Sequence, residues 1–183
     1  IEILEMLISA GANPEAVTRL GRYTPLHLAS KIGKDASVVS LLRLGSAVNP
    51  RTTTGAVTPL HFAAASGSQV AVKALLDYGA DVDATETWRE QTALMWATVE
   101  GNTSAVQALI AADADIHARS TGGFTPLLFA VRHNQQDTLG ALVAAGADVD
   151  DQFPSGLSAL ALATLNAHYD LGVWLLEQGA DPN

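Results

Sequence analysis

The chain has 183 residues, of which 48% are hydrophobic types and 16% are charged, and this mix is too apolar for an intrinsically disordered chain. Acidic residues outnumber basic ones by 19 to 10, and the net charge of −9 argues against nucleic acids or anionic membranes as main partners, because both require a positive field. The absence of cysteine excludes disulfides, thiolate metal sites and cysteine nucleophiles.

The start of the chain predicts a single amphipathic helix. Leu4, Leu7 and Ile8 lie at helical spacing and form one apolar stripe. No basic segment followed by an apolar stretch and a cleavage site is visible, so the sequence shows no signal peptide. No apolar run approaches the roughly 18 residues of a membrane span. We therefore expect a cytoplasmic location.

Two markers then recur along the whole chain. The tetrad Thr24-Pro25-Leu26-His27 returns as Thr58-Pro59-Leu60-His61, and altered forms begin at residues 92, 125 and 158. A second marker, Gly-Ala-Asp or a variant of it, begins 21 residues after each first marker, at residues 45, 79, 113, 146 and 179. The 21-residue part is constant in length, which indicates a packed unit, whereas the connector absorbs a one-residue difference and is expected to be a loop.

Each constant part predicts two short helices. Thr or Ser is a favourable N-cap, and Pro suits the first helical turn. The second helix carries an apolar stripe, as in Val72, Leu75 and Leu76, and stops at a glycine. Asp113 replaces that glycine in one unit, so we expect a left-handed backbone there, and Gly172 interrupts the stripe of the last unit. Helices of about eight residues are unstable alone, so the units must stack on one another.

The tetrad, the helix pair and the Gly-Ala-Asp ending resemble the ankyrin repeat, and the resemblance covers essentially the whole chain. It implies an all-α repeat solenoid of stacked helix-turn-helix repeats joined by β-hairpin-like loops. We expect one array over residues 1–183, with a leading half-repeat at 1–20 and helix pairs starting near 24, 58, 92, 125 and 158. Because both ends lack part of a repeat, we expect the chain to be an excerpt of a longer one.

The sequence shows no catalytic, cofactor or metal motif. None of the five histidines forms a spaced ligand pair, and no nucleophile-elbow, phosphate-loop or dinucleotide motif occurs. The Asp clusters of the second marker lack the order of a calcium loop and recur at one repeat position, which favours a role in turns. The resemblance suggests that His27 and His61 tie neighbouring repeats together. We expect no catalytic residue, cofactor or metal.

The resemblance further implies that partner proteins bind at the connector tips and the exposed, concave face of the first helices. Carried over to this chain, the predicted partner-binding residues are Trp88, Arg89, Glu90, Arg22, Tyr23, Lys31, Phe124, Arg132, His133 and Phe153. Tyr, Trp and Arg are the types that dominate binding energy at interfaces. Trp88 either contacts a partner or packs on a neighbouring connector. For Tyr23 and Phe124 the alternative to partner contact is also packing, because their position is apolar in other repeats.

These observations favour a non-catalytic protein–protein interaction module. The alternative is a regulatory or targeting domain of a larger enzyme, channel or effector whose catalytic part lies outside the chain. We expect a protein partner, with no nucleic acid, membrane insertion or small-molecule substrate. Residues 1–76 carry a net charge of +3 and residues 77–183 a net charge of −12. We therefore expect a partner of opposite polarity, or one held by the acidic half through its own Lys and Arg.

Overall fold

The structure, a computed structural model, describes residues 2–182, and this range contains eleven α-helices. A leading helix, α1 (Glu2–Ser9), precedes five helix pairs. The first helices of the pairs are α2 (Pro25–Lys31), α4 (Pro59–Ser66), α6 (Ala93–Val99), α8 (Pro126–Arg132) and α10 (Ala159–Leu165). The second helices are α3 (Asp35–Arg43), α5 (Gln69–Asp77), α7 (Thr103–Ile110), α9 (Gln136–Ala144) and α11 (Tyr169–Glu177). Within the described range, no helix has the length and apolar character to cross a membrane.

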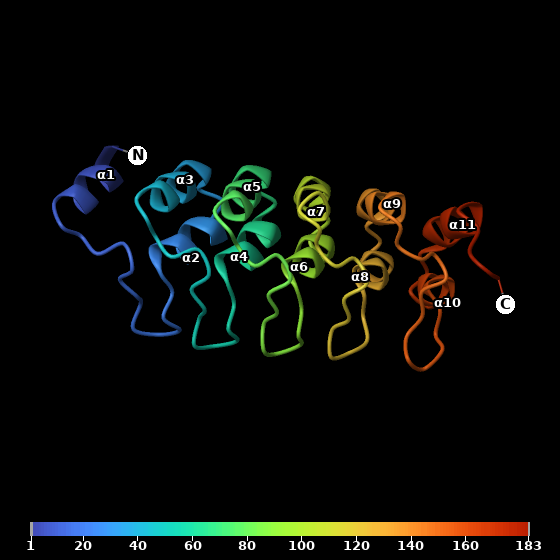
Figure 1. Ribbon diagram of the computed structural model, residues 1–183. Coiled ribbons are helices and arrows are strands. Elements are labelled where there is room, and N and C mark those ends of the chain that lie inside the picture. The colour runs from blue at the N-terminus through green and yellow to red at the C-terminus, as the bar shows by residue number, and fades with distance from the viewer. Residues whose placement is uncertain (1, 183) are drawn as a thin grey trace.

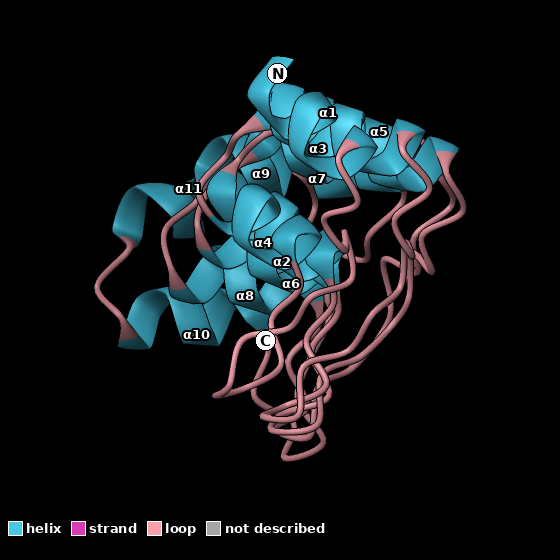
Figure 2. Ribbon diagram, turned by 90° about the vertical axis from the view of Figure 1, so that its left-hand side faces the viewer, coloured by secondary structure: helices cyan, strands magenta, loops and turns pink. Residues whose placement is uncertain are grey.

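The helices form two layers, and a row of long loops projects from the layer of first helices (Figure 1). Seen from the end of the stack, α1 and the second helices form the upper layer, the first helices form the layer beneath it, and the loops extend to the bottom (Figure 2). The first helices pack on one another from α2 to α10 and the second helices from α3 to α9, and one core cluster of buried residues runs along the stack. The predicted all-α repeat solenoid is confirmed.

Each loop folds back on itself like a hairpin and is called a finger here; the five fingers are residues 18–23, 52–57, 86–91, 120–124 and 153–157. In every finger the backbone N–H of the first residue donates to the carbonyl of the last, at 2.9–3.1 Å. The described residues contain isolated bridges, Thr85–Thr92 and Gln152–Ser158, and no longer strand. The loops are therefore hairpin-like without forming a sheet.

The first helices start as the sequence predicts. Thr24 is an extended N-cap whose hydroxyl accepts the backbone N–H of His27, and Pro25 occupies the first turn. The same cap recurs at Thr92, Thr125 and Ser158. A side-chain cap satisfies one of the backbone donors that a helix start leaves unpaired, which contributes about 1 kcal/mol.

The stripes of the second helices form the core. In α5, Val72 and Leu75 are fully buried, and Leu76 is partly buried against them. In α1, Leu4 and Ile8 pack against the core, whereas Leu7 is 55% exposed. Leu7 stays exposed because α1 packs on α3 and no described first helix lies beneath it.

Gly172 offers a site for stabilisation. It is buried inside α11, and a methyl group added there would lie 3.7 Å from Leu160 Cδ1 and 4.0 Å from Ala163 Cβ, which is ordinary contact. We expect Gly172→Ala to raise the free energy of unfolding by about 1 kcal/mol, because alanine costs less helical entropy than glycine. Urea denaturation measures this. Gly179→Ala is the control: it should destabilise, since Gly179 has a left-handed φ of 97°.

Asp113 adopts the predicted left-handed backbone, with a φ of 60°. Because a side chain makes this conformation costly, we expect Asp113→Gly to stabilise the protein by about 0.5–1 kcal/mol. Gly79 holds the same place in its repeat, with a φ of 86° and open space around its missing Cβ. The reciprocal change Gly79→Asp should therefore destabilise. Equal or lower stability of Asp113→Gly in the same melts would refute the strain argument.

Candidate partner-binding face

The surface formed by the fingers and the exposed sides of the first helices is called the first-helix face here. It carries the predicted partner-binding residues, which lie in three groups along the stack. Arg22, Tyr23 and Lys31 belong to the first repeat, and Trp88, Arg89 and Glu90 form the tip of the third finger. The remaining residues come from the fourth and fifth repeats: Phe124, Arg132, His133 and Phe153.

A polar side chain inside each of the first four fingers holds its shape. Thr18, Thr52 and Ser120 accept a backbone N–H from the far arm of their own finger, at 3.0–3.1 Å. The third finger uses a carboxylate instead. Glu86 is only 1% exposed, and its oxygens accept the backbone N–H groups of Trp88 at 2.5 Å, Arg89 at 2.9 Å and Gln91 at 3.1 Å. This buried charge is satisfied by hydrogen bonds and fixes the backbone at the tip.

Neighbouring fingers are joined at their tips by backbone hydrogen bonds. Thr53 N–H donates to the Gly21 carbonyl at 3.0 Å, Thr87 to Gly55 at 2.8 Å, and Thr121 to Arg89 at 2.8 Å. The fifth finger departs from this pattern, because Pro154 occupies the donor position and has no N–H. The first four fingers therefore form one continuous, linked row.

Trp88 packs on the neighbouring finger and also remains exposed, so packing is observed and contact with a partner stays a prediction. A Cβ on the buried Gly55 would lie 2.5 Å from indole atoms of Trp88, so the ring rests on the backbone of the second finger. At the same time the residue is 60% exposed. The indole is thus positioned by the neighbouring finger while most of its surface stays in contact with solvent.

Tyr23 belongs to a row of aromatic rings beneath the first-helix face. Its ring centroid lies 5.8 Å from that of Phe62, which in turn lies 5.9 Å from Trp96 in an edge-to-face arrangement. The Lys31 ammonium stands 5.7 Å from the Tyr23 centroid and 5.6 Å from that of Phe62. Tyr23 is therefore a packing residue that also supports a cation.

Phe124 has the same double role at the other end of the face. It stacks on Phe129 with centroids 4.7 Å apart and meets Phe153 edge to face at 4.6 Å. The Arg132 guanidinium carbon lies 5.0 Å from the Phe124 centroid. His133, which follows Arg132, is exposed. Partial burial, and to a lesser degree the Arg132 charge, lower the pKa of His133 below its usual range.

Sequence reasoning missed the aromatic residues of the first helices themselves. Phe62, Trp96 and Phe129 each stand four residues after the capping threonine, 34 and 33 residues apart. The sequence does show three large aromatic residues at one repeat position. That their rings contact one another or other rings of the face becomes visible only once the helices are stacked.

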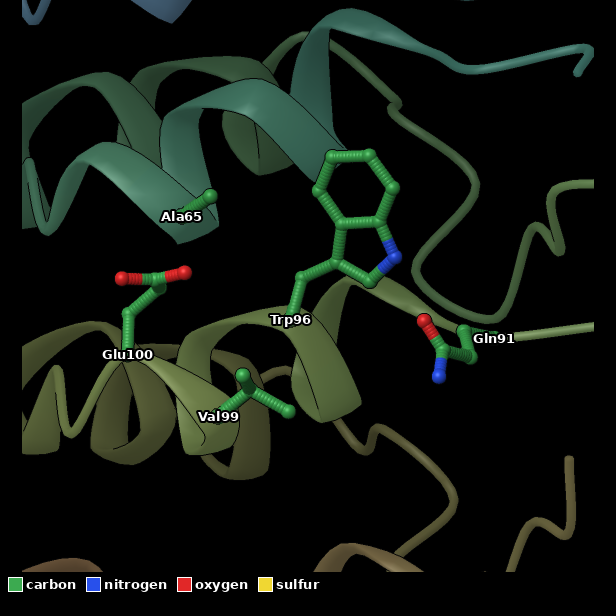
Figure 3. A pocket seen from close by; sticks show the side chains of 5 residues that line it. All are labelled: Ala65, Gln91, Trp96, Val99 and Glu100. Atoms are coloured by element: carbon green, nitrogen blue, oxygen red, sulfur yellow. The ribbon is translucent and has the colours of Figure 1, made fainter. Parts of the chain in front are cut away.

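A pocket of about 250 Å³ opens between α4 and α6 at the middle of the face, lined by Ala65, Gln91, Trp96, Val99 and Glu100 (Figure 3). A second hollow shares Gln91 and Trp96 with it and reaches Trp88 and Arg89 on the finger. The small side chain of Ala65 leaves the space, and the Trp96 ring forms a wall of the pocket (Figure 3). The Trp96 indole nitrogen is buried without a hydrogen-bond partner in the described chain. The pocket is mainly apolar with polar groups at its rim, as a site for one large side chain requires.

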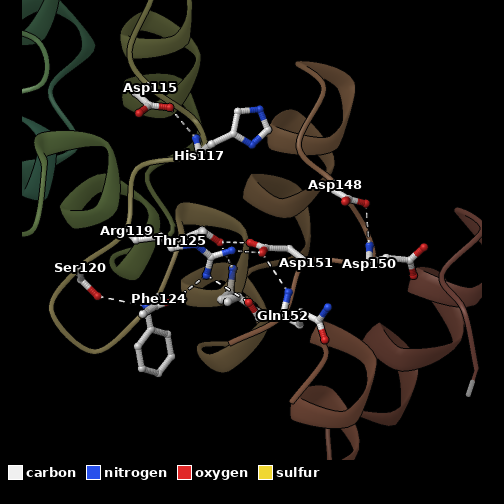
Figure 4. A network of polar contacts seen from close by, with 12 residues as sticks. Asp115, His117, Arg119, Ser120, Phe124, Thr125, Asp148, Asp150, Asp151 and Gln152 are labelled. Atoms are coloured by element: carbon white, nitrogen blue, oxygen red, sulfur yellow. Dashed lines mark hydrogen bonds and ion pairs between the residues drawn. The ribbon is translucent and has the colours of Figure 1, made fainter. Parts of the chain in front are cut away.

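The Arg119 side chain stabilises the fold and is not free to contact a partner through its paired guanidinium nitrogens. Its guanidinium pairs with the Asp151 carboxylate at 2.5 Å and donates to the carbonyls of Gly123 at 2.9 Å and Gln152 at 3.1 Å (Figure 4). Thr125 Oγ1 donates to the other Asp151 oxygen at 2.5 Å. This network ties the fourth and fifth fingers where the tip hydrogen bond is missing.

The Asp clusters act in turns, as expected, and one of their carboxylates also links neighbouring repeats. Asp83 accepts the backbone N–H of Asp115 from the next repeat at 2.9 Å, and Asp148 accepts that of Asp150 at 3.0 Å. Among the described residues no group of three or more His, Cys, Asp or Glu side chains is placed to hold a metal ion.

A sequence model of ankyrin repeats in three copies matches residues 1–86 and 94–183. The chain therefore belongs to the ankyrin-repeat family. No curated protein matches the chain.

His27 and His61 link each repeat to the next, as expected, below the aromatic row. The His27 Nδ1 accepts from the Thr24 hydroxyl at 2.9 Å and its Nε2 donates to the Val57 carbonyl at 3.0 Å. His61 bridges Thr58 and the Gln91 carbonyl in the same way. A carbonyl can only accept, so Nε2 carries the proton. The backbone N–H groups of Thr24 and Thr58 donate to the Nδ1 atoms of His27 and His61 at 3.1 and 3.4 Å, so Nδ1 is unprotonated.

This geometry makes stability depend on pH. Burial lowers the pKa of His27 and His61 below the ordinary value of 6.5, although the carbonyl contacts oppose this. The unfolded chain then binds more protons, so the stability contribution is present above pH 6.5 and is lost as the pH falls through the lowered folded-state pKa. We expect the free energy of unfolding to decrease as the pH is lowered from neutral through 6.5 and below.

Urea melts of His27→Gln/His61→Gln over this range should give a less stable protein with a flatter pH profile. His117→Gln, at an exposed connector residue, should keep the original slope. An unchanged slope in the double variant would contradict the role assigned to the two imidazoles.

Proposed function

We propose that this protein is a non-catalytic protein–protein interaction module that binds its partner through the fingertips and the first-helix face. Membership of the ankyrin-repeat family supports protein binding in general. The use of this particular face is supported by the side chains that the stack does not require. Catalysis is not needed to explain any residue described above.

One observation carries the proposal: large side chains are held in place by backbone or aromatic rings that lie beneath or beside them, yet they remain exposed. Trp88 rests on Gly55, while Lys31 and Arg132 stand over aromatic rings. A side chain that is already immobilised loses little rotamer entropy on binding, so more of the contact energy remains for affinity. Fixed aromatic and arginine side chains are the usual centres of binding energy.

The partner is first captured on the immobilised chain and identified by mass spectrometry, and its affinity is then measured by calorimetry. We expect Trp88→Ala to weaken binding at least tenfold, because truncating an anchoring aromatic residue costs about 2 kcal/mol or more. The melting temperature should change little, since the side chain is already 60% exposed.

Tyr78→Ala serves as the matched control, because Tyr78 is an exposed aromatic at the end of a second helix, away from the fingers. It should leave affinity unchanged. Loss of folding in Trp88→Ala would assign the residue to packing alone. Binding that survives the combined Trp88→Ala, Arg89→Ala and Arg132→Ala changes would exclude this face.

A further inference from the structure

The charges of this protein separate by face as well as along the chain. The fingers and first helices, taken as residues 17–32, 51–66, 85–100, 118–133 and 151–166, hold seven basic and four acidic residues, a net charge of +3. The remaining residues hold three basic and fifteen acidic ones, a net charge of −12. The surface that carries Trp88 is therefore the basic side of an acidic protein.

Half of the acidic residues on this side are used internally. Glu86 is buried and accepts three backbone N–H groups, and Asp151 pairs with Arg119. The exposed acids that remain are Glu90 and Glu100. Arg22, Lys31, Arg89 and Arg132 are exposed on the same face, and no ion pair is formed by any of them among the described residues. The field that a partner meets here is positive.

The apolar and basic features also have a fixed order along the stack. Lys31, at the end of α2, and Arg132, at the end of α8, are each held over aromatic rings. The pocket at Trp96 lies between α4 and α6, midway between these two cations. An apolar pocket with a fixed cation on either side favours a ligand with an apolar centre and acidic flanks.

We infer that the partner docks on this face through an acidic, extended protein segment whose single large apolar side chain enters the Trp96 pocket between Lys31 and Arg132. This inference rests on the proposed function and specifies its partner. It differs from the expectation drawn from the two halves of the sequence, in which the acidic half holds a basic partner. Most of the acidic residues lie outside the first-helix face, in connectors and second helices, and several of them, such as Asp83 and Asp148, accept backbone N–H groups in turns or from the next repeat.

The spacing of the helices sets the length of the segment. Adjacent packed helices lie about 8–10 Å apart, so the three steps from α2 to α8 span about 24–30 Å. An extended chain advances about 3.3 Å per residue, so about eight or nine residues cover this distance. The apolar anchor is thus expected about four residues from the acidic residue on each side. Glu100 at the pocket rim disfavours an acid directly beside the anchor.

The probe is a phage-displayed library of random peptides of about 12 residues, longer than the segment expected from the strand rise, selected on the immobilised chain. Selected peptides are then synthesised with a fluorescein label, and binding is followed by anisotropy. We expect enriched sequences to be acidic with one Phe, Trp, Leu or Met near the centre. Replacing that anchor by Ala should weaken binding at least tenfold, and added salt should also weaken it.

Two pairs of variants locate the contacts. Lys31→Glu/Arg132→Glu should raise the Kd on the order of tenfold or more, since two attractive charges become repulsive. Arg43→Glu/Lys73→Glu changes the net charge equally but on the second helices, and it should have little effect. Ala65→Leu fills the pocket and should weaken binding similarly, whereas Ala65→Ser should not.

Each other outcome overturns the inference in a recognisable way. Basic or uncharged peptides that still lose binding in Ala65→Leu would refute the acidic segment and leave the proposed face intact. Peptides sensitive only to Arg43→Glu/Lys73→Glu would refute both. Failure to enrich any sequence would refute a linear segment as the ligand, while Trp88→Ala still tests the face against the captured protein. A labelled oligo-dT that binds more tightly than the peptides would assign the positive field to nucleic acid.

Discussion

Each helix in the described part of this protein is too short to be stable by itself, and the rest of the structure follows from that constraint. The helices have seven to nine residues, whereas isolated helices below about 12–15 residues are marginal in water. Their stability must come from burial against the next repeat. For that reason the buried stripe and the threonine or serine cap recur at almost fixed intervals, and the first two helix pairs add a histidine link to the next repeat.

The same constraint leaves some positions free. A residue at a fingertip or on the exposed side of a first helix does not take part in the stripe, so its identity is open to other uses. The fingers are nevertheless rigid, because backbone hydrogen bonds at Thr53, Thr87 and Thr121 join each of the first four to its neighbour. Variable side chains on a rigid, linked row provide a preorganised surface, which lowers the entropic cost of binding.

The fold was largely predictable from the sequence because its determinants are local and repeated. A capping threonine, a proline in the first turn and a glycine at the helix end act within a few residues, and the constant 21-residue interval shows which parts pack. Asp113 was predictable for the same reason, since its backbone conformation follows from the place that glycine takes elsewhere.

The details of the candidate site were less predictable because they depend on contacts between repeats. That Trp88 rests on Gly55 requires the register of two adjacent fingers, which are 33 residues apart at these positions. The role of Glu86 as an internal acceptor was hidden because threonine or serine serves the same purpose in the other fingers. The pocket depends on a small residue, Ala65, facing a large one, Trp96, from the next repeat.

The net charge of the chain and the charge of the first-helix face have opposite signs, and the structure supplies the reason. Many of the acids are placed where backbone N–H groups need an acceptor. Asp83, for example, accepts the backbone N–H of Asp115 from the next repeat. Such carboxylates satisfy the connectors that join repeats, so their number grows with the number of repeats and not with the demands of a partner. The basic residues concentrate on the fingers and first helices, where Lys31 and Arg132 are held over aromatic rings. An acidic protein can in this way present a basic face, and a partner that docks on that face would meet its local charge and not the sum over the chain.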